Sequence, residues 1–158
     1  MKINEQNTLC LEICRIAHEG QVDKAGAAYR FHPMRVALRL RHGTEAEQCA
    51  ALLHDVLEDS VVSEGDLREM GVSEEVISIV RELTKTPSDT SYIAYIQRLV
   101  ESGNVSAMRV KLADLYDNTS QGRVRYISDS LLNRYKTAIG IISNALGVER
   151  YQDIDANV

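Results

Sequence analysis

Four side chains in this sequence have the types and surroundings of metal ligands. His54 and Asp55 are adjacent in the largely apolar run 50–57, His32 precedes a proline, and Asp114 is bracketed by aliphatic residues. A carboxylate buried without a partner is costly, and a bound cation is one of the few things that offset the cost. We therefore expect these four residues to converge on one metal ion.

Two histidines and two aspartates form a mixed nitrogen and oxygen shell. Such a shell suits Mn²⁺, Fe²⁺ or Zn²⁺ better than Ca²⁺, and it lacks the thiolates of a structural zinc site. Four protein ligands leave room for water on an ion that takes six, and the metal would turn that water into a nucleophile and neutralise phosphate charge. The alternative interpretation, a solvated acidic helix face that includes a histidine, stays open at this stage.

Helices must position these ligands, because the hydrophobic periodicity is helical and only two prolines occur, so the chain is predicted to be all-α. Thr44 and Glu47 have the spacing of a capping box and predict a helix from there to Asp59. The polar residues of its last turns share an arc of about 140°, opposite an apolar face: His54, Asp55, Glu58 and Asp59.

The remaining pattern predicts a compact multi-helix bundle in a single domain, residues 1–150, followed by a polar tail, 151–158. Pro33 favours a helix that begins at His32, and a loop over 21–31 precedes it. Further helices are expected over 4–18, 63–70, 73–83, 88–102, 105–118 and 128–146.

Composition limits the possible partners and the compartment. A net charge of −5 leaves no general basic surface for nucleic acid, and no window is apolar for long enough to span a bilayer. The first seven residues are mostly polar, so no secretory signal is expected. Cys10, Cys14 and Cys49 form no CxxC pair, which favours a reduced, cytoplasmic protein.

Several motifs follow one another over roughly residues 10 to 120: HEGQ (18–21), DK (23–24), Tyr29, His32-Pro33, ALLHDVLEDS (51–60), LTK (83–85) and VKLADLYDN (110–118). In this order they resemble the hydrolase domain of RelA/SpoT-type alarmone enzymes, which are HD-type phosphohydrolases. The ordered set is far more specific than a lone His-Asp pair.

The resemblance implies packed helices around one divalent metal, Mn²⁺, held by His32, His54, Asp55 and Asp114. It implies that Glu58 and Asp59 orient or deprotonate the attacking water. Substrate contacts are implied for four further residues: Lys24, Tyr29, Lys111 and Asn118. The implied reaction removes the 3′-pyrophosphate of (p)ppGpp, a phosphorylated guanine nucleotide, and gives GDP or GTP and pyrophosphate.

Two departures from the family pattern keep other functions open. Asp23 stands where many alarmone hydrolases have a basic residue, and its carboxylate would repel a tetraphosphorylated nucleotide unless it points away. The sequence also carries no synthetase or regulatory domain after the hydrolase motifs, so hydrolysis alone is expected. The alternatives are an HD hydrolase for another phosphorylated nucleotide or metabolite, and a protein that binds a nucleotide without turning it over.

A few residues fit two interpretations. Tyr92 and Tyr95 have the spacing of a packing stripe, but they could also wall the pocket and stack on a base. Arg123 and Arg125 could meet phosphates or lie on the surface. His18 fits a helix end better than the site. The sequence leaves the oligomeric state undetermined.

Overall fold

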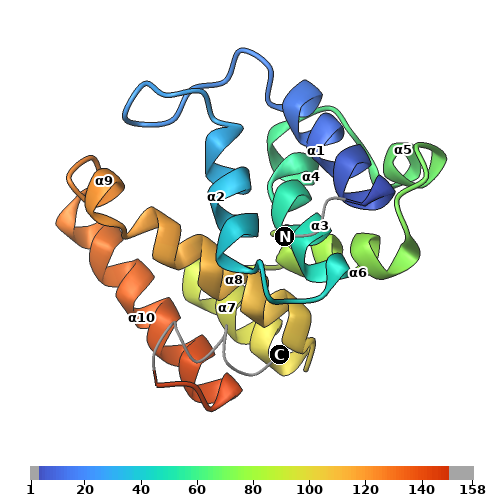
Figure 1. Ribbon diagram of the computed structural model, residues 1–158. Coiled ribbons are helices and arrows are strands. Elements are labelled where there is room, and N and C mark those ends of the chain that lie inside the picture. Colours follow the sequence, from blue (N-terminus) through green and yellow to red (C-terminus); the bar gives the residue numbers. More distant parts are fainter. Residues whose placement is uncertain (1–3, 150–158) are drawn as a thin grey trace.

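The computed structural model describes residues 4–149, which fold into a bundle of ten helices (Figure 1). The helices are α1 (Glu5–Ala17), α2 (Phe31–Arg39), α3 (Glu45–Leu53), α4 (Val56–Asp59), α5 (Glu64–Glu69), α6 (Glu74–Leu83), α7 (Tyr92–Glu101), α8 (Val105–Asn118), α9 (Gln121–Val124) and α10 (Asp129–Leu146). Within residues 4–149 the only β pairing is an isolated bridge between Val22 and Ala28. The all-α prediction is confirmed, whereas the expected tail, 151–158, lies outside the described residues.

Most helices begin at a side chain that caps the free backbone N–H groups of the first turn. The predicted capping box of α3 is present: the Thr44 hydroxyl accepts from the Glu47 backbone N–H at 3.1 Å, and the Glu47 carboxylate accepts from the Thr44 backbone N–H at 3.0 Å. Helix α2 begins at Phe31, one residue before the predicted start. Pro33 is then the third helical residue, where its missing N–H still costs no intrahelical bond.

Helix α3 is the centre of the bundle and packs against α1, α2, α6 and α8. Every residue from Ala46 to Leu53 is buried, including Glu47 and Gln48, so this part of the helix packs on all sides. Small residues at Cys49, Ala50 and Ala51 let neighbouring helices approach α3 from all sides. Because α2 also packs on α8, the three helices that carry the predicted metal ligands contact one another.

The helix predicted to run to Asp59 is interrupted at His54 and Asp55, between α3 and α4. In a continuous helix the Ala51 carbonyl would accept the backbone N–H of Asp55, four residues later. Here the Ala51 carbonyl accepts from Nδ1 of His54 at 2.7 Å. This side-chain bond competes with the helical one, so the polar pair stands at a break and not on a regular helix face.

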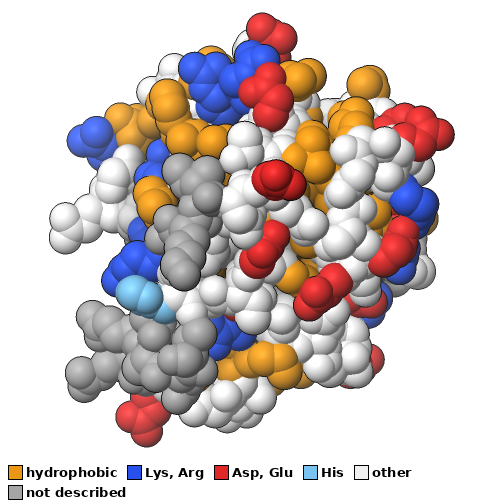
Figure 2. All heavy atoms as spheres, turned by 45° about the vertical axis from the view of Figure 1, so that its right-hand side comes forward, with side chains coloured by type: hydrophobic (Ala, Val, Ile, Leu, Met, Phe, Trp, Pro, Cys, Tyr) orange, Lys and Arg blue, Asp and Glu red, His pale blue; other side chains and the backbone are white. Residues whose placement is uncertain are grey.

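The C-terminal helix α10 lies against α7 and α8 and closes one side of the bundle (Figure 1). Its packing residues Ala138 and Ile142 are fully buried. On the face seen in Figure 2, acidic side chains are scattered and the basic ones lie in separate groups, in keeping with the net charge of −5. No helix among residues 4–149 has the length and apolar character that crossing a bilayer requires.

Candidate active site

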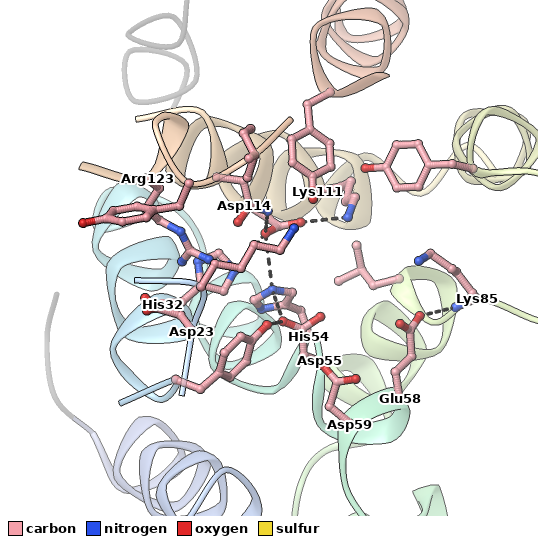
Figure 3. Close-up of a pocket in the computed structure, with 18 of the residues that line it drawn as sticks. Asp23, His32, His54, Asp55, Glu58, Asp59, Lys85, Lys111, Asp114 and Arg123 are labelled. Carbon is pink, nitrogen blue, oxygen red and sulfur yellow. Dashed lines mark hydrogen bonds and ion pairs between the residues drawn. The ribbon is translucent and has the colours of Figure 1, made fainter. Parts of the chain in front are cut away.

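A pocket of about 370 Å³ lies where α2, the α3–α4 break and α8 meet (Figure 3). Every residue predicted for the site lines it: Lys24, Tyr29, His32, His54, Asp55, Glu58, Asp59, Lys111, Asp114 and Asn118. These residues come from segments almost a hundred positions apart, so the fold brings the predicted set together.

Three of the four predicted metal ligands form a tight buried cluster. The ligand atoms of His32, His54 and Asp114 all lie within 4.8 Å of one another. Nε2 of His32 is 2.9 Å from Oδ1 of Asp114, and Nε2 of His54 is 3.6 Å from the same oxygen. Helix α2, the end of α3 and helix α8 each contribute one of these residues.

The hydrogen bonds of the two histidines direct their lone pairs into the cluster. Nδ1 of His54 faces the carbonyl oxygen of Ala51, and Nδ1 of His32 lies 2.7 Å from the Asp117 carboxylate, so both acceptors require a proton on Nδ1. In the neutral rings Nε2 then carries the lone pair. Nε2 of His54 is buried, and the groups nearest to it are carboxylate oxygens of Asp55 and Asp114, which can only accept.

This donor set fits a divalent cation. With both rings neutral, two imidazole lone pairs and a carboxylate face one another, and each is an electron-pair donor. Metal-binding histidines commonly donate their other ring N–H to a carboxylate or a carbonyl, and His32 and His54 do so here.

The electrostatics of the cluster likewise favour bound positive charge. Burial opposes protonation of His54, but the carboxylates of Asp55 and Asp114 outweigh it and raise the His54 pKa well above its ordinary value. Burial also opposes ionisation of Asp114, yet Lys111 and the two histidines hold its pKa well below the usual range. The site therefore keeps the Asp114 carboxylate ionised although it lies out of water.

The fourth predicted ligand, Asp55, extends the cluster from His54. Its Oδ2 lies 2.9 Å from Nε2 of His54 and accepts a 2.5 Å hydrogen bond from the Tyr29 hydroxyl. Tyr29 was predicted to contact substrate, and the structure shows it bonded to a predicted ligand. The break between α3 and α4 turns Asp55 toward the same side as His54 (Figure 3).

Comparison with known proteins gives the site a context, although no family model matches the chain. A probable guanosine-3′,5′-bis(diphosphate) 3′-pyrophosphohydrolase of Mycoplasma pneumoniae is 32% identical over 129 residues, which are 72% of this chain and 18% of that protein. The guanosine-3′,5′-bis(diphosphate) 3′-pyrophosphohydrolase of Haemophilus influenzae is 35% identical over 115 residues, 67% of this chain and 17% of that protein.

Among solved structures, a metazoan ortholog of SpoT that hydrolyses ppGpp has the same fold, with a TM-score of 0.75 at 22% sequence identity. The match covers 99% of this chain and 94% of that one. This chain is a RelA/SpoT-like HD domain. It spans less than a fifth of the length of the two bacterial relatives.

In this HD domain the residues predicted to handle the attacking water, Glu58 and Asp59, both lie on the short helix α4 and line the pocket. The Glu58 carboxylate accepts from the backbone N–H of Lys85 at 2.6 Å. Burial and the neighbouring carboxylates of Asp55 and Glu58 raise the pKa of Asp59. A carboxylate with a raised pKa is a better proton acceptor than a free aspartate.

Two predicted substrate contacts of the HD domain bind a predicted ligand instead of pointing free into the pocket. Lys111 donates to Oδ2 of Asp114 at 2.7 Å, and the Asn118 amide donates to Oδ1 at 2.8 Å. Both oxygens of Asp114 are thus held from the same helix, one turn before and one turn after it. Lys24 is an exposed residue of the loop that lines the pocket.

Asp23, the departure noted in the sequence, organises the loop that precedes α2. Its Oδ1 accepts from the backbone N–H groups of Ala25 and Ala27 at 2.9 and 3.0 Å, around Gly26, whose φ is +82°. One carboxylate oxygen is therefore turned into its own loop. Asp23 still lines the pocket of the HD domain, so it stays a source of negative charge there.

Sequence reasoning missed several residues of the site. Asp117 accepts from His32, and its signal was the i+3 spacing from Asp114 on one helix face. Lys85, in the LTK motif, and Tyr135 also line the pocket. Tyr92 and Tyr95, which fitted two interpretations, pack against one another and also line the pocket; stacking on a base stays a prediction.

Proposed function

We propose that this HD domain removes the 3′-pyrophosphate of ppGpp or pppGpp with one divalent cation, Mn²⁺, held by His32, His54, Asp55 and Asp114. The convergence of imidazole lone pairs and carboxylates at the floor of a pocket lined by lysines and an arginine carries the proposal. Relatives named for this reaction support the choice of substrate.

When bound, the cation would acidify a water molecule and neutralise phosphate charge. Side chains of the protein carry out the other steps of the reaction. Asp59, with its raised pKa, accepts the proton of the attacking water, and Glu58, held by the Lys85 backbone, orients that water. Tyr29 keeps Asp55 in place through its hydroxyl.

The cations of the pocket are suited to the phosphates. Lys85 and Lys111 place their ammonium groups over the ring of Tyr92, at 5.6 and 5.7 Å from its centroid, and Lys24 and Arg123 line the same cavity. Among the described residues, Lys85 has no carboxylate partner for its ammonium, so it is available to a phosphate. The Tyr135 ring, 6.0 Å from that of Tyr92, offers an aromatic surface for a base.

A second substrate class, another phosphorylated nucleotide or metabolite with fewer phosphates, is favoured by one observation. Asp23 adds a carboxylate to the pocket next to Lys24, and like charges disfavour a highly phosphorylated ligand. The loop bonds of Asp23 Oδ1 reduce this conflict but leave the charge in place.

The test is release of pyrophosphate and GDP from ppGpp by the purified protein with Mn²⁺, with Asp55→Ala as the control. Metal-dependent release that disappears in the variant supports the proposal. If the protein binds one metal ion tightly but releases no pyrophosphate, the substrate is wrong, and other phosphorylated nucleotides are then assayed. Equal release by Asp55→Ala would contradict the assigned ligand.

A further inference from the structure

Asp117 is a buried carboxylate that lies beside the pocket and does not line it. It is on α8, three residues after Asp114, and its exposed fraction is 0%. Removing a carboxylate from water is costly unless charge and hydrogen bonds compensate for it. The groups that compensate for the burial of Asp117 therefore indicate the role of its carboxylate.

Four cationic or protonated groups surround this one carboxylate. Oδ2 lies 2.7 Å from Nδ1 of His32. Arg35 donates through Nε at 3.0 Å to Oδ1 and through Nη2 at 3.1 Å to Oδ2, and Arg123 donates through Nη1 at 3.2 Å to Oδ2. Arg39 lies at 3.6 Å. Burial opposes ionisation, but His32 and Arg35 outweigh it and lower the Asp117 pKa.

A purely structural ion pair would need only one of these arginines. The carboxylate also receives the ring N–H of His32, and an ionised carboxylate can only accept, so it holds the proton on Nδ1 and leaves Nε2 facing Asp114 at 2.9 Å. Asp117 and Asp114 thus contact the two opposite nitrogens of the same ring from the same face of α8.

We infer that Asp117 is a positioning residue, which fixes the ring and tautomer of His32 for metal binding, with Arg35 and Arg123 holding its carboxylate in place. The inference rests on the metal centre of the proposed function but not on the substrate. A carboxylate behind a ligating histidine orients the ring and makes it a better donor to the metal. Nδ1 of His54 faces only the neutral carbonyl oxygen of Ala51, so a charged acceptor orients His32 and a neutral one orients His54.

The arginines also connect this carboxylate to the pocket. Arg35 is on α2 with His32, one turn later, so one carboxylate docks the whole start of α2 onto α8. Arg123, on α9, lines the pocket beside His32 and Asp114 (Figure 3). Asp117 therefore anchors both a metal ligand and a cation that faces substrate.

The first experiment measures Zn²⁺ and Mn²⁺ affinity of Asp117→Asn by competition with a chelating dye. The amide keeps the shape but not the charge, and it can present its N–H₂ to the ring. We expect affinity to fall about 10- to 100-fold while the circular dichroism spectrum stays unchanged. Arg35→Gln is the matched control, because it removes a partner of the same carboxylate but leaves the His32 bond; its affinity should fall much less.

A second measurement separates positioning from mere stability. In the Zn²⁺-loaded protein with ¹⁵N-labelled histidine, the Nδ1 proton of His32 should be far downfield and slow to exchange. In Asp117→Asn it should move upfield and exchange faster, while the His54 signal stays in place. If Asp117→Asn fails to fold, Asp117→Glu keeps the charge but displaces the acceptor, and it should show the same loss of affinity.

The outcomes distinguish this inference from the proposed function. A folded Asp117→Asn protein with unchanged metal affinity and an unchanged His32 signal overturns the inference and leaves Asp117 as a structural ion pair. Wild-type protein that binds neither metal overturns the metal centre and the inference together. Metal binding that weakens in the variant, in a protein inactive on ppGpp, supports the inference and contradicts only the substrate.

Discussion

The carboxylate of Glu58 accepts a 2.6 Å hydrogen bond from the backbone N–H of Lys85, a residue 27 positions later in the chain. This bond ties the short helix α4 to the segment that follows α6. It holds a predicted catalytic side chain in place before any substrate arrives. Figure 3 shows Glu58 and Asp59 on the same short helix, with Glu58 turned to Lys85.

Glu58→Gln should therefore separate the chemistry from the structure. The amide oxygen can still accept from the Lys85 backbone N–H, but the neutral side chain no longer presents a carboxylate to orient the attacking water. We expect turnover of ppGpp to fall about 10²- to 10⁴-fold with metal content unchanged, measured by pyrophosphate release and by metal analysis after dialysis. Glu64→Gln, on α5 and outside the pocket, is the control. Full activity in Glu58→Gln would mean that Glu58 only supports the loop.

Removal of the metal should lower the melting temperature. A ligand present at a hundred times its dissociation constant stabilises the folded state by about 2.7 kcal/mol. For a domain of this size that corresponds to about 5–10 °C, measured by differential scanning fluorimetry with Mn²⁺ and then with excess EDTA. His54→Gln lacks one ligand and should melt at nearly the same temperature in both buffers. A wild-type shift no larger than the variant's would count against the metal centre.

The ion pair between Glu47 and Arg109 should contribute far more to the free energy of unfolding than the surface ion pairs do. Glu47 is 4% exposed, accepts from Ser106 and lies 3.0 Å from Arg109, so it joins α3 to α8 at the far end from the pocket. Breaking a buried pair by removing one partner typically costs about 3–5 kcal/mol. Glu47→Gln should lose stability of that order in urea unfolding.

The exposed pair of Arg68 and Glu74 provides the contrast for that measurement. Glu74→Gln should leave the free energy of unfolding nearly unchanged, because water screens the pair. If Glu47→Gln and Glu74→Gln lose similar amounts of unfolding free energy, the connection between α3 and α8 does not depend on the buried pair.

Asp89 should make the stability of the fold depend on pH. Hydrogen bonds from Arg98 lower its pKa from 3.8 to about 2, and its side chain is 6% exposed. The pKa of Asp89 is lower in the folded state than in the unfolded state. The ion pair therefore contributes fully to stability above the pKa of the unfolded state, about 4, and this contribution is lost as the pH falls through about 2. The difference in melting temperature between wild type and Asp89→Asn should therefore become smaller as the pH falls from about 4 to about 2. A constant difference would contradict the assigned ion pair.

The helices could be predicted because their signals are local. The capping box at Thr44 marks a start that the structure reproduces within one residue, α1 begins within one residue of its predicted start, and α8 has the predicted bounds. The break at His54 was missed because it depends on where a ring nitrogen points, and hydrophobic periodicity carries no such information. Helix α9 was also missed, because four residues are too few to show a period.

The sequence by itself determined the fold class and most residues of the candidate site, because motif order, residue type and helix periodicity are properties of the chain alone. The tertiary structure decided how those residues are used. Packing of α2 on α8 puts Asp117 behind His32, and the turn at Asp23 points one carboxylate oxygen into its own loop. Lys111 and Asn118 hold Asp114 from within α8, as their helical spacing already indicates. The contact of Asp117 with His32 depends on distances between atoms of separate segments, which only the folded chain defines.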